Sequence, residues 1–345
     1  MRPLISGSLL FAVLFLPALQ AHGEAPSFRM TTNVHDESGT AGLITTTSPS
    51  SSSTLTTSLD GTSGSLTRNL SVRFGLDHIN PDYSRYLILD RSGSATPLAN
   101  SFNAPENVGR FGVDFTAQRL TLSVDGAQTI SETPFPGGSV GLMGTYDSYE
   151  KGARYSLNLT RSDYSAPLSY FDAPETFQTL PRPTRLLEDR LTVAWEQVLT
   201  EMLKSRIETF VADHPQNQPS VVGGEAALAF ALDGKSALIG KLGSAHQLQN
   251  TQIFDDRGYL DATWMQIEYR LEPAFRWALS AGAGTVYETE SARGRFPYQR
   301  IGTDTLSIGA RTREKMFEIG ITALGAFSNT GYQSIQVGGD LLWQI

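Results

Sequence analysis

The last 14 residues, 332–345, alternate between apolar and polar side chains up to the final position. Successive side chains of a strand point to opposite faces, so this pattern predicts a strand with one apolar and one polar face. A long edge of this kind invites pairing with other chains, so we expect the strand to be paired within a closed sheet. The apolar face consists of Ile335, Val337, Gly339, Leu341, Trp343 and Ile345, and the polar face of Ser334, Gln336, Gly338, Asp340 and Gln344.

A membrane β-barrel provides such closure, with one face toward lipid, the other toward a polar lumen, and aromatic residues near both interfaces. The ending Trp343-Gln344-Ile345 resembles the terminal signal of bacterial outer-membrane β-barrel proteins, although that signal usually closes on Phe. The resemblance implies an all-β, transmembrane antiparallel barrel of the porin-like kind. It implies two partners as well, the outer-membrane lipid and the barrel-assembly machinery that recognises the C-terminal strand. It concerns architecture and selects no single family.

The N-terminal residues have the features of a secretory signal peptide. Arg2 precedes an apolar run over residues 9–16, and small residues follow up to Ala21. The run is shorter than the roughly 20 residues that a membrane-spanning helix needs, so we predict a signal peptide over residues 1–21 and a barrel over residues 22–345. The chain has no cysteine, so an exported protein of this sequence has no disulfide framework.

The charge of the chain restricts its partners. The formal net charge is −8 and there is no basic run, which argues against nucleic acid. No two histidines have metal-ligand spacing, and residues 255–258 lack the series of oxygen ligands of a calcium loop. We therefore expect neither a metal nor another cofactor.

The same alternation recurs upstream of the last strand, at residues 259–271, 275–287, 305–311 and 317–327. Tight turns are predicted at residues 150–152, 201–202, 233–234, 272–273 and 313–314, with longer polar connections between them. Bacterial barrels have short periplasmic turns and long external loops, and counting back from the C-terminus puts every tight turn on the periplasmic side. The pattern predicts about 16 strands.

Two regions are ambiguous. The Ser/Thr-rich tract around residues 45–66 is interpreted as a long external loop, whose hydroxyl groups could also extend a hairpin above the membrane. Residues 187–210 fit strands but also place apolar residues at helical spacing. A helix or plug there would leave 14 strands.

A barrel of about 16 strands encloses an aqueous lumen, so the inward residues are the functional candidates. Their charges have two interpretations: they act across the lumen as a transverse field, or they pair between adjacent strands and keep the wall polar. The predicted lumen-lining residues are Arg73, Asp114, Arg154, Glu196, Arg206, Glu208, Glu268, Arg270, Arg276, Arg311, Glu318 and Asp340. The predicted aromatic girdle is Tyr269, Phe275, Trp277, Tyr287, Phe317, Phe327 and Trp343.

The sequence favours a channel in the outer membrane of a Gram-negative bacterium, through which small polar solutes or ions diffuse. A structural, adhesive or export-accessory barrel is the first alternative. An enzyme resembling the omptin proteases or the outer-membrane phospholipases is a more distant one, because Asp213 and His214 are adjacent and would point to opposite faces of a strand. We expect no catalytic residues, and the sequence leaves the oligomeric state open.

Overall fold

The computed structural model describes residues 27–39, 50–67, 69–85, 87–89, 95–97, 105–131, 136–166, 184–214, 218–248, 260–274, 276–290, 299–314, 317–329 and 333–344. The predicted signal peptide, Phe275 and Ile345 lie outside these residues, as do Asp255 and Asp256.

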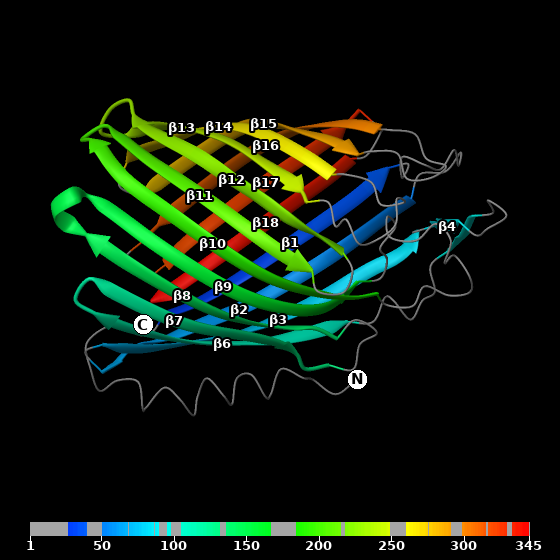
Figure 1. Ribbon diagram of the computed structural model, residues 1–345, viewed down its shortest axis with the longest axis horizontal. Helices are drawn as coiled ribbons and strands as arrows, with labels where there is room; N and C mark the ends of the chain where they lie inside the picture. Colours follow the sequence, from blue (N-terminus) through cyan, green and yellow to red (C-terminus); the bar gives the residue numbers. More distant parts are fainter. Residues whose placement is uncertain are drawn as a thin grey trace.

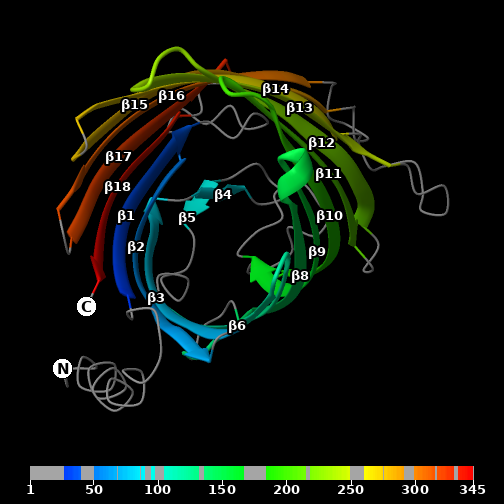
Figure 2. The ribbon, with the colours of Figure 1, turned by 90° about the vertical axis from the view of Figure 1, so that its left-hand side faces the viewer.

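The described chain forms one closed antiparallel barrel of 16 strands, as the sequence predicted (Figure 1, Figure 2). The barrel strands are β1 (Ser27–Gly39), β2 (Ser50–Thr67), β3 (Leu70–Arg85), β6 (Glu106–Ala117), β7 (Leu120–Thr129), β8 (Gly138–Ser148), β9 (Ala153–Ala166), β10 (Thr184–Thr200), β11 (Leu203–His214), β12 (Gln218–Ala231), β13 (Ser236–Gln247), β14 (Leu260–Ala274), β15 (Trp277–Glu290), β16 (Gln299–Arg313), β17 (Phe317–Ser328) and β18 (Gln333–Gln344). Each strand pairs with its neighbours along the chain, and β18 pairs with β1 to close the ring.

The region with helical spacing forms strands β10 and β11, which pair with each other from Asp189 to Thr200 on β10. The strand interpretation is therefore correct, and the count of 14 is wrong. Within the described residues no helix is long and apolar enough to cross a membrane.

The two ends of the barrel differ. At one end, which we call the short-turn end, β2–β3, β6–β7, β8–β9, β10–β11, β12–β13, β14–β15 and β16–β17 are joined by a few residues each. Ser27 and Gln344, the outermost residues of β1 and β18, pair at this same end. At the opposite end, the loop end, the connections are mostly longer. Three predicted turns, at residues 150–152, 201–202 and 233–234, fall where expected.

The turn between β12 and β13 is organised by Asp233. Its carboxylate accepts hydrogen bonds from the Ser236 hydroxyl at 2.8 Å and from the backbone N–H groups of Lys235 and Ser236 at 2.8 and 2.6 Å. The Ser236 hydroxyl, followed by the Lys235 N–H, lowers the pKa of Asp233 below its ordinary value because both stabilise the carboxylate.

The turn predicted at Glu272 and Pro273 is wrong by about two residues, because both belong to β14. The pairing of β14 with β15 shifts register between Leu271 and Ala274, which marks a β-bulge or irregularity. A proline has no N–H to donate to the ladder and is tolerated within sheets at such bulges. The predicted turn at Arg313 and Glu314 is shifted by one residue, since Arg313 ends β16.

The Ser/Thr-rich tract is a barrel strand rather than an external loop over residues 50–66. β2 pairs with β1 from Ser50 opposite Gly39 to Thr62 opposite Ser27. Threonine is β-branched and suits a strand, so the composition that suggested a loop is compatible with pairing. Residues 45–49 lie outside the described residues.

Large apolar side chains lie on the outside of the barrel, and the described chain has no large apolar core. Its buried apolar residues are Ala153, Ala194 and Ala212, whereas Ile308 and Ile321 are 66% and 61% exposed. Such a surface is suited to lipid, where exposed apolar groups cost nothing and all backbone groups are paired within the barrel.

A small two-stranded sheet lies in the connection between β3 and β6. Its strands are β4 (Leu87–Leu89) and β5 (Ala95–Pro97), and we call it the β4–β5 hairpin. Figure 1 places it beyond the strand ends at the loop end, and in Figure 2 it falls within the outline of the barrel. It therefore lies across part of the mouth at the loop end.

Candidate functional site on the inner wall

Contacts that skip a strand identify the inner face of the barrel. Side chains converge on the concave face of a curved sheet and diverge on the convex face, so only inward groups reach the strand after next. Arg73 on β3 reaches Asp125 on β7 past β6, and Trp264 on β14 reaches Glu225 on β12 past β13. Register partners on paired strands share a face, and so do alternate residues of one strand. These two rules identify the inward residues of the other strands.

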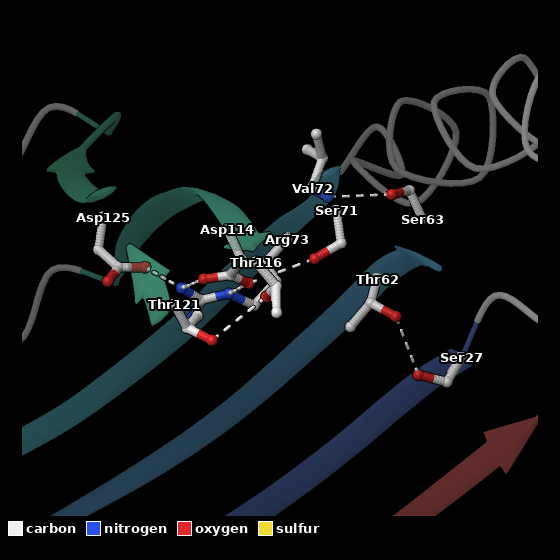
Figure 3. Close-up of polar contacts among 10 residues, drawn as sticks. All are labelled: Ser27, Thr62, Ser63, Ser71, Val72, Arg73, Asp114, Thr116, Thr121 and Asp125. Atoms are coloured by element: carbon white, nitrogen blue, oxygen red, sulfur yellow. Dashed lines mark hydrogen bonds and ion pairs between the residues drawn. The ribbon is translucent and has the colours of Figure 1, made fainter. Parts of the chain in front are cut away.

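Arg73 bridges two strands of the inner wall (Figure 3). Its Nε donates to Asp114 Oδ2 on β6 at 2.7 Å, and its Nη2 donates to Asp125 Oδ1 on β7 at 2.6 Å. The guanidinium crosses Gly112, the register partner of Arg73, where an added Cβ would lie 3.2 Å from Arg73 Cζ and 2.6 Å from Asp125 Oδ1. The bridge therefore depends on the missing side chain at Gly112.

Arg110 makes the reciprocal bridge from β6. Its Nη2 lies 2.8 Å from Asp60 Oδ1 on β2 and 2.6 Å from Asp77 Oδ1 on β3. It crosses Gly75, its own register partner, where a Cβ would lie 3.2 Å from Arg110 Cζ. Two arginines and four aspartates thus form a charged ladder over β2, β3, β6 and β7, with more acid than base. We call these six residues the Arg–Asp ladder.

A second series of charges runs across β8 to β11. Arg154 Nε donates to Asp147 at 2.6 Å, and Arg206 donates to Glu196 at 3.1 Å and to Glu208 at 2.5 Å. Arg154 and Glu196 are register partners between β9 and β10. Acidic and basic side chains therefore alternate from strand to strand along this part of the wall.

The remaining predicted lumen residues form smaller groups. Glu318 is 6% exposed and lies 3.0 Å from Arg311 and 2.8 Å from Arg313. Asp340 on β18 lies 3.9 Å from Arg311, past β17. On β14, Arg270 donates to Glu268 at 2.7 Å.

Arg276 does not join the predicted patch with Glu268 and Arg270. It lies in the turn after β14 and donates to Glu314, in the next turn of the same end, at 2.8 Å. Among the described residues, most inward charges thus have a partner on the same or a nearby strand, which matches the second interpretation of the sequence, pairing within the wall.

Two inward aromatic residues were missed by the sequence reasoning. The Trp264 indole Nε1 donates to Glu225 at 2.9 Å, and its ring covers Gly243 on β13. Phe210 on β11 lies under the guanidinium of Arg190, with Cζ 4.1 Å from the ring centroid. The sequence does indicate their position, because each ring stands on the side of its strand whose other residues are mostly polar.

The wall opposite the Arg–Asp ladder carries the Glu268–Arg270 pair and Trp264 among shorter side chains. β14 lies eight places from β6 in the ring of 16 strands, so the two face each other across the lumen. Around β14 the inward positions include Ala227, Ala229, Gly243, Gly282 and Gly284. The lumen is therefore lined unevenly, with four acids and two bases on one side and one acid–base pair among shorter groups on β14.

The girdle residues lie on the outer face. Tyr269, Trp277, Phe317 and Trp343 are near the short-turn end, and Tyr287 and Phe327 are toward the loop end. The rings of Phe317 and Trp343 stack, with centroids 6.3 Å apart. Outward positions near the loop end instead carry charged residues such as Asp189, Asp213 and Asp304.

The candidate protease pair lies at the loop end of β11, which extends to His214. Asp213 faces outward and accepts a hydrogen bond from the Ser220 hydroxyl at 2.6 Å. The pairing of β11 with β12 is irregular between Ala212 and His214, where the strand ends.

Comparison with solved structures agrees with this architecture. A bacterial polysaccharide outer membrane secretin superposes with a TM-score of 0.52 at 10% sequence identity, covering 92% of this chain and 98% of its own. OccAB1 of Acinetobacter baumannii superposes with a TM-score of 0.51 at 9% identity, covering 93% and 96%. No family model and no curated protein sequence matches the chain. At these identities the comparison shows the fold alone, and that fold is the one found in bacterial outer-membrane β-barrels.

Proposed function

We propose that this protein is an outer-membrane channel through which small polar solutes or ions diffuse passively. The observation that carries the proposal is the division of the barrel into two faces, an apolar outer surface and an inner wall lined by paired charges. A closed barrel of 16 strands is wide enough to leave an aqueous channel when no large apolar side chains fill it.

The same division supports a position in the outer membrane of a Gram-negative bacterium. The short-turn end would lie in the periplasm and the loop end outside the cell, as in other bacterial barrels. The aromatic residues near the short-turn end would then lie at the periplasmic interface. Lipid and the barrel-assembly machinery, which would engage β18, are the partners that this placement implies.

The paired charges favour passage of many small polar solutes over strong selection for one ion. A carboxylate beside a guanidinium presents little net charge at a distance, so the wall is polar without a strong field across the lumen. The proposal assigns the inner residues a role in solvating and guiding solutes and assigns no residue a role in catalysis.

Conductance tests the proposal directly. Folded, purified protein added to a planar lipid bilayer should produce discrete current steps whose size rises with the bulk salt concentration. The same preparation, unfolded by heat and added at equal concentration, is the control. Bilayers that stay silent with protein of proven heat-modifiable fold would instead favour a structural, adhesive or export-accessory barrel.

Hydrolysis assays address the enzyme alternative separately. The folded protein in detergent should cleave neither phospholipid nor peptide at a rate above that of an empty-micelle control. Turnover that depends on the folded state would contradict a purely passive role.

A further inference from the structure

A cavity of about 410 Å³ opens on the inner wall where β8 to β12 meet the short-turn end. It lies beside the short helix η2 (Tyr149–Lys151) of the β8–β9 turn, drawn as the green coil in Figure 2. Its charged lining comes from Asp147, Arg154, Glu196, Lys204 and Arg206. We call this cavity the η2 pocket.

The pocket exists because long and short side chains face each other across paired strands. Lys204 and Arg206 on β11 are the register partners of Ala229 and Ala227 on β12. The two alanines leave open the space that larger inward residues would fill. The pairing of β10 with β11 also shifts register between Val198 and Thr200, at the edge of the pocket. Such irregularities re-aim side chains and occur preferentially beside functional sites.

The charged groups around the η2 pocket are not all paired. Asp147 pairs with Arg154, and Arg206 is shared by Glu196 and Glu208. Both arginines are already paired with these carboxylates. Within the part of the chain that the structure describes, Lys204 makes no ion pair. Among the described residues, Lys204 is therefore the cation of the pocket that has no carboxylate partner.

We propose that the η2 pocket binds a small organic anion, with its carboxylate on Lys204 and its carbon skeleton over Ala227 and Ala229. The volume is within the range of small-molecule sites, and a few converging polar groups on a concave surface are typical of such sites. The inference deepens the proposed channel function by giving it a preferred solute class, although binding itself requires only the folded barrel.

The test uses three probes of one size and different charge: gluconate, glucose and glucosamine. Ligand-observed NMR titrations of the folded full-length protein in detergent should give the lowest dissociation constant for gluconate. Lys204→Gln should weaken gluconate binding about tenfold and leave glucose unchanged, because it removes one charge-assisted hydrogen bond. Lys241→Gln is the matched control, since Lys241 also faces inward, forms no ion pair with another described residue, and lies on β13 outside the pocket.

The outcomes separate the inference from the channel proposal. Equal binding of all three probes, tighter binding of glucosamine, or full gluconate affinity in Lys204→Gln would each overturn the anion site. Selective gluconate binding by a barrel that conducts no current would retain the site and remove the channel. Heat-modifiability of each variant establishes that a loss of binding does not reflect a loss of fold.

Discussion

Long side chains on the inner wall reach the strand after next because the strand between carries a glycine. Arg73 and Arg110 each cross a glycine to reach a carboxylate on the strand after next, and Trp264 does the same over Gly243. Each exposed ion pair contributes little alone, typically below about 1 kcal/mol. Their repetition across strands instead fixes which side chains face the water, because a slip of one residue would move every charge to the lipid side.

A pair of substitutions on β17 tests which side chains face lipid and which face the lumen. Ile321 is 61% exposed on the outer face, whereas Thr322 faces inward between Gly309 and Gly338. Ile321→Arg should destabilise the barrel by about 2–4 kcal/mol, because the charge enters lipid near mid-strand. Thr322→Arg should cost much less, since its neighbours leave room and water. Urea unfolding in lipid vesicles gives both values, and equal costs would mean that the register is wrong.

Among the elements, β18 is the strand on which closure depends. It pairs with β17 on one side and with β1 on the other, and Trp343 lies opposite both Phe28 and Phe317. It also carries the alternation from which the barrel was first predicted. The strand that closes the ring is thus also the one whose ending resembles a terminal signal.

Deleting residues 343–345 should lower the amount of folded protein in the outer membrane. The truncation removes the last ladder contacts at the seam and the stacked ring of Trp343. Trp277→Ala is the control, because Trp277 lies on the outer face at the same end but on an interior strand pair. Heat-modifiability and protease resistance in membrane fractions measure the effect, and equal yields of truncated and full-length barrel would contradict it.

The β4–β5 hairpin gives a prediction of a different kind. Replacing residues 86–105 with a short Gly/Ser linker should raise single-channel conductance, because the hairpin lies across part of the mouth. Bilayer recordings at one salt concentration compare the two forms. An unchanged conductance would place the narrowest part of the path elsewhere.

Most strands could be predicted because apolar and polar side chains alternate with a period of two residues, and this period is visible in the sequence. Residues 277–287 and 317–327 illustrate this, with Trp277 and Ile321 on the outside as expected. β2 was missed because its outward positions include Thr57, which carries little apolar signal. The Glu272-Pro273 turn was misplaced because the irregularity in β14 admits a proline within the strand.

The site could be predicted only in part, for a geometric reason. Alternation indicates that Arg73 and Asp114 share a face, but not that Arg73 also reaches Asp125 on β7. Contacts that skip a strand depend on barrel curvature and on the glycine between, and neither is visible from one strand alone. Phe210 and Trp264 were missed because their type suggests lipid while their position faces inward.

For the whole molecule, the uneven lining of the lumen matters more than any one charge. The Arg–Asp ladder has four acids and two bases and faces β14, whose inward charges are the Glu268–Arg270 pair. A solute passing close to the ladder meets a stronger local field than one passing along the opposite wall. Because most inward charges of the described residues are paired, selectivity should be weak, and it should respond when a paired charge loses its partner.

Replacing Arg270 and Arg276 with Gln should shift the reversal potential toward cation preference at low salt. The change leaves Glu268 and Glu314 without their cations near the short-turn end. The shift should fade in concentrated salt, because the Debye length falls from about 8 Å at 0.15 M to about 3 Å at 1 M. Arg161→Gln is the matched control, since Arg161 lies on the outer face beside Asp189. An unchanged reversal potential in the double variant would remove these residues from the conducting path.

The pairing of Ser27 with Gln344 makes the barrel a ring in which the start of the chain is arbitrary. A short peptide joining these two positions would leave all 16 strand pairs intact, so new ends could be opened between β9 and β10. Such a circular permutant would have the same wall but a different last strand. Its folded form should be equally stable once made in vitro. If insertion depends on β18 being translated last, the permutant should not be inserted into the membrane. That result would separate the residues that stabilise the barrel from those that target it to the membrane.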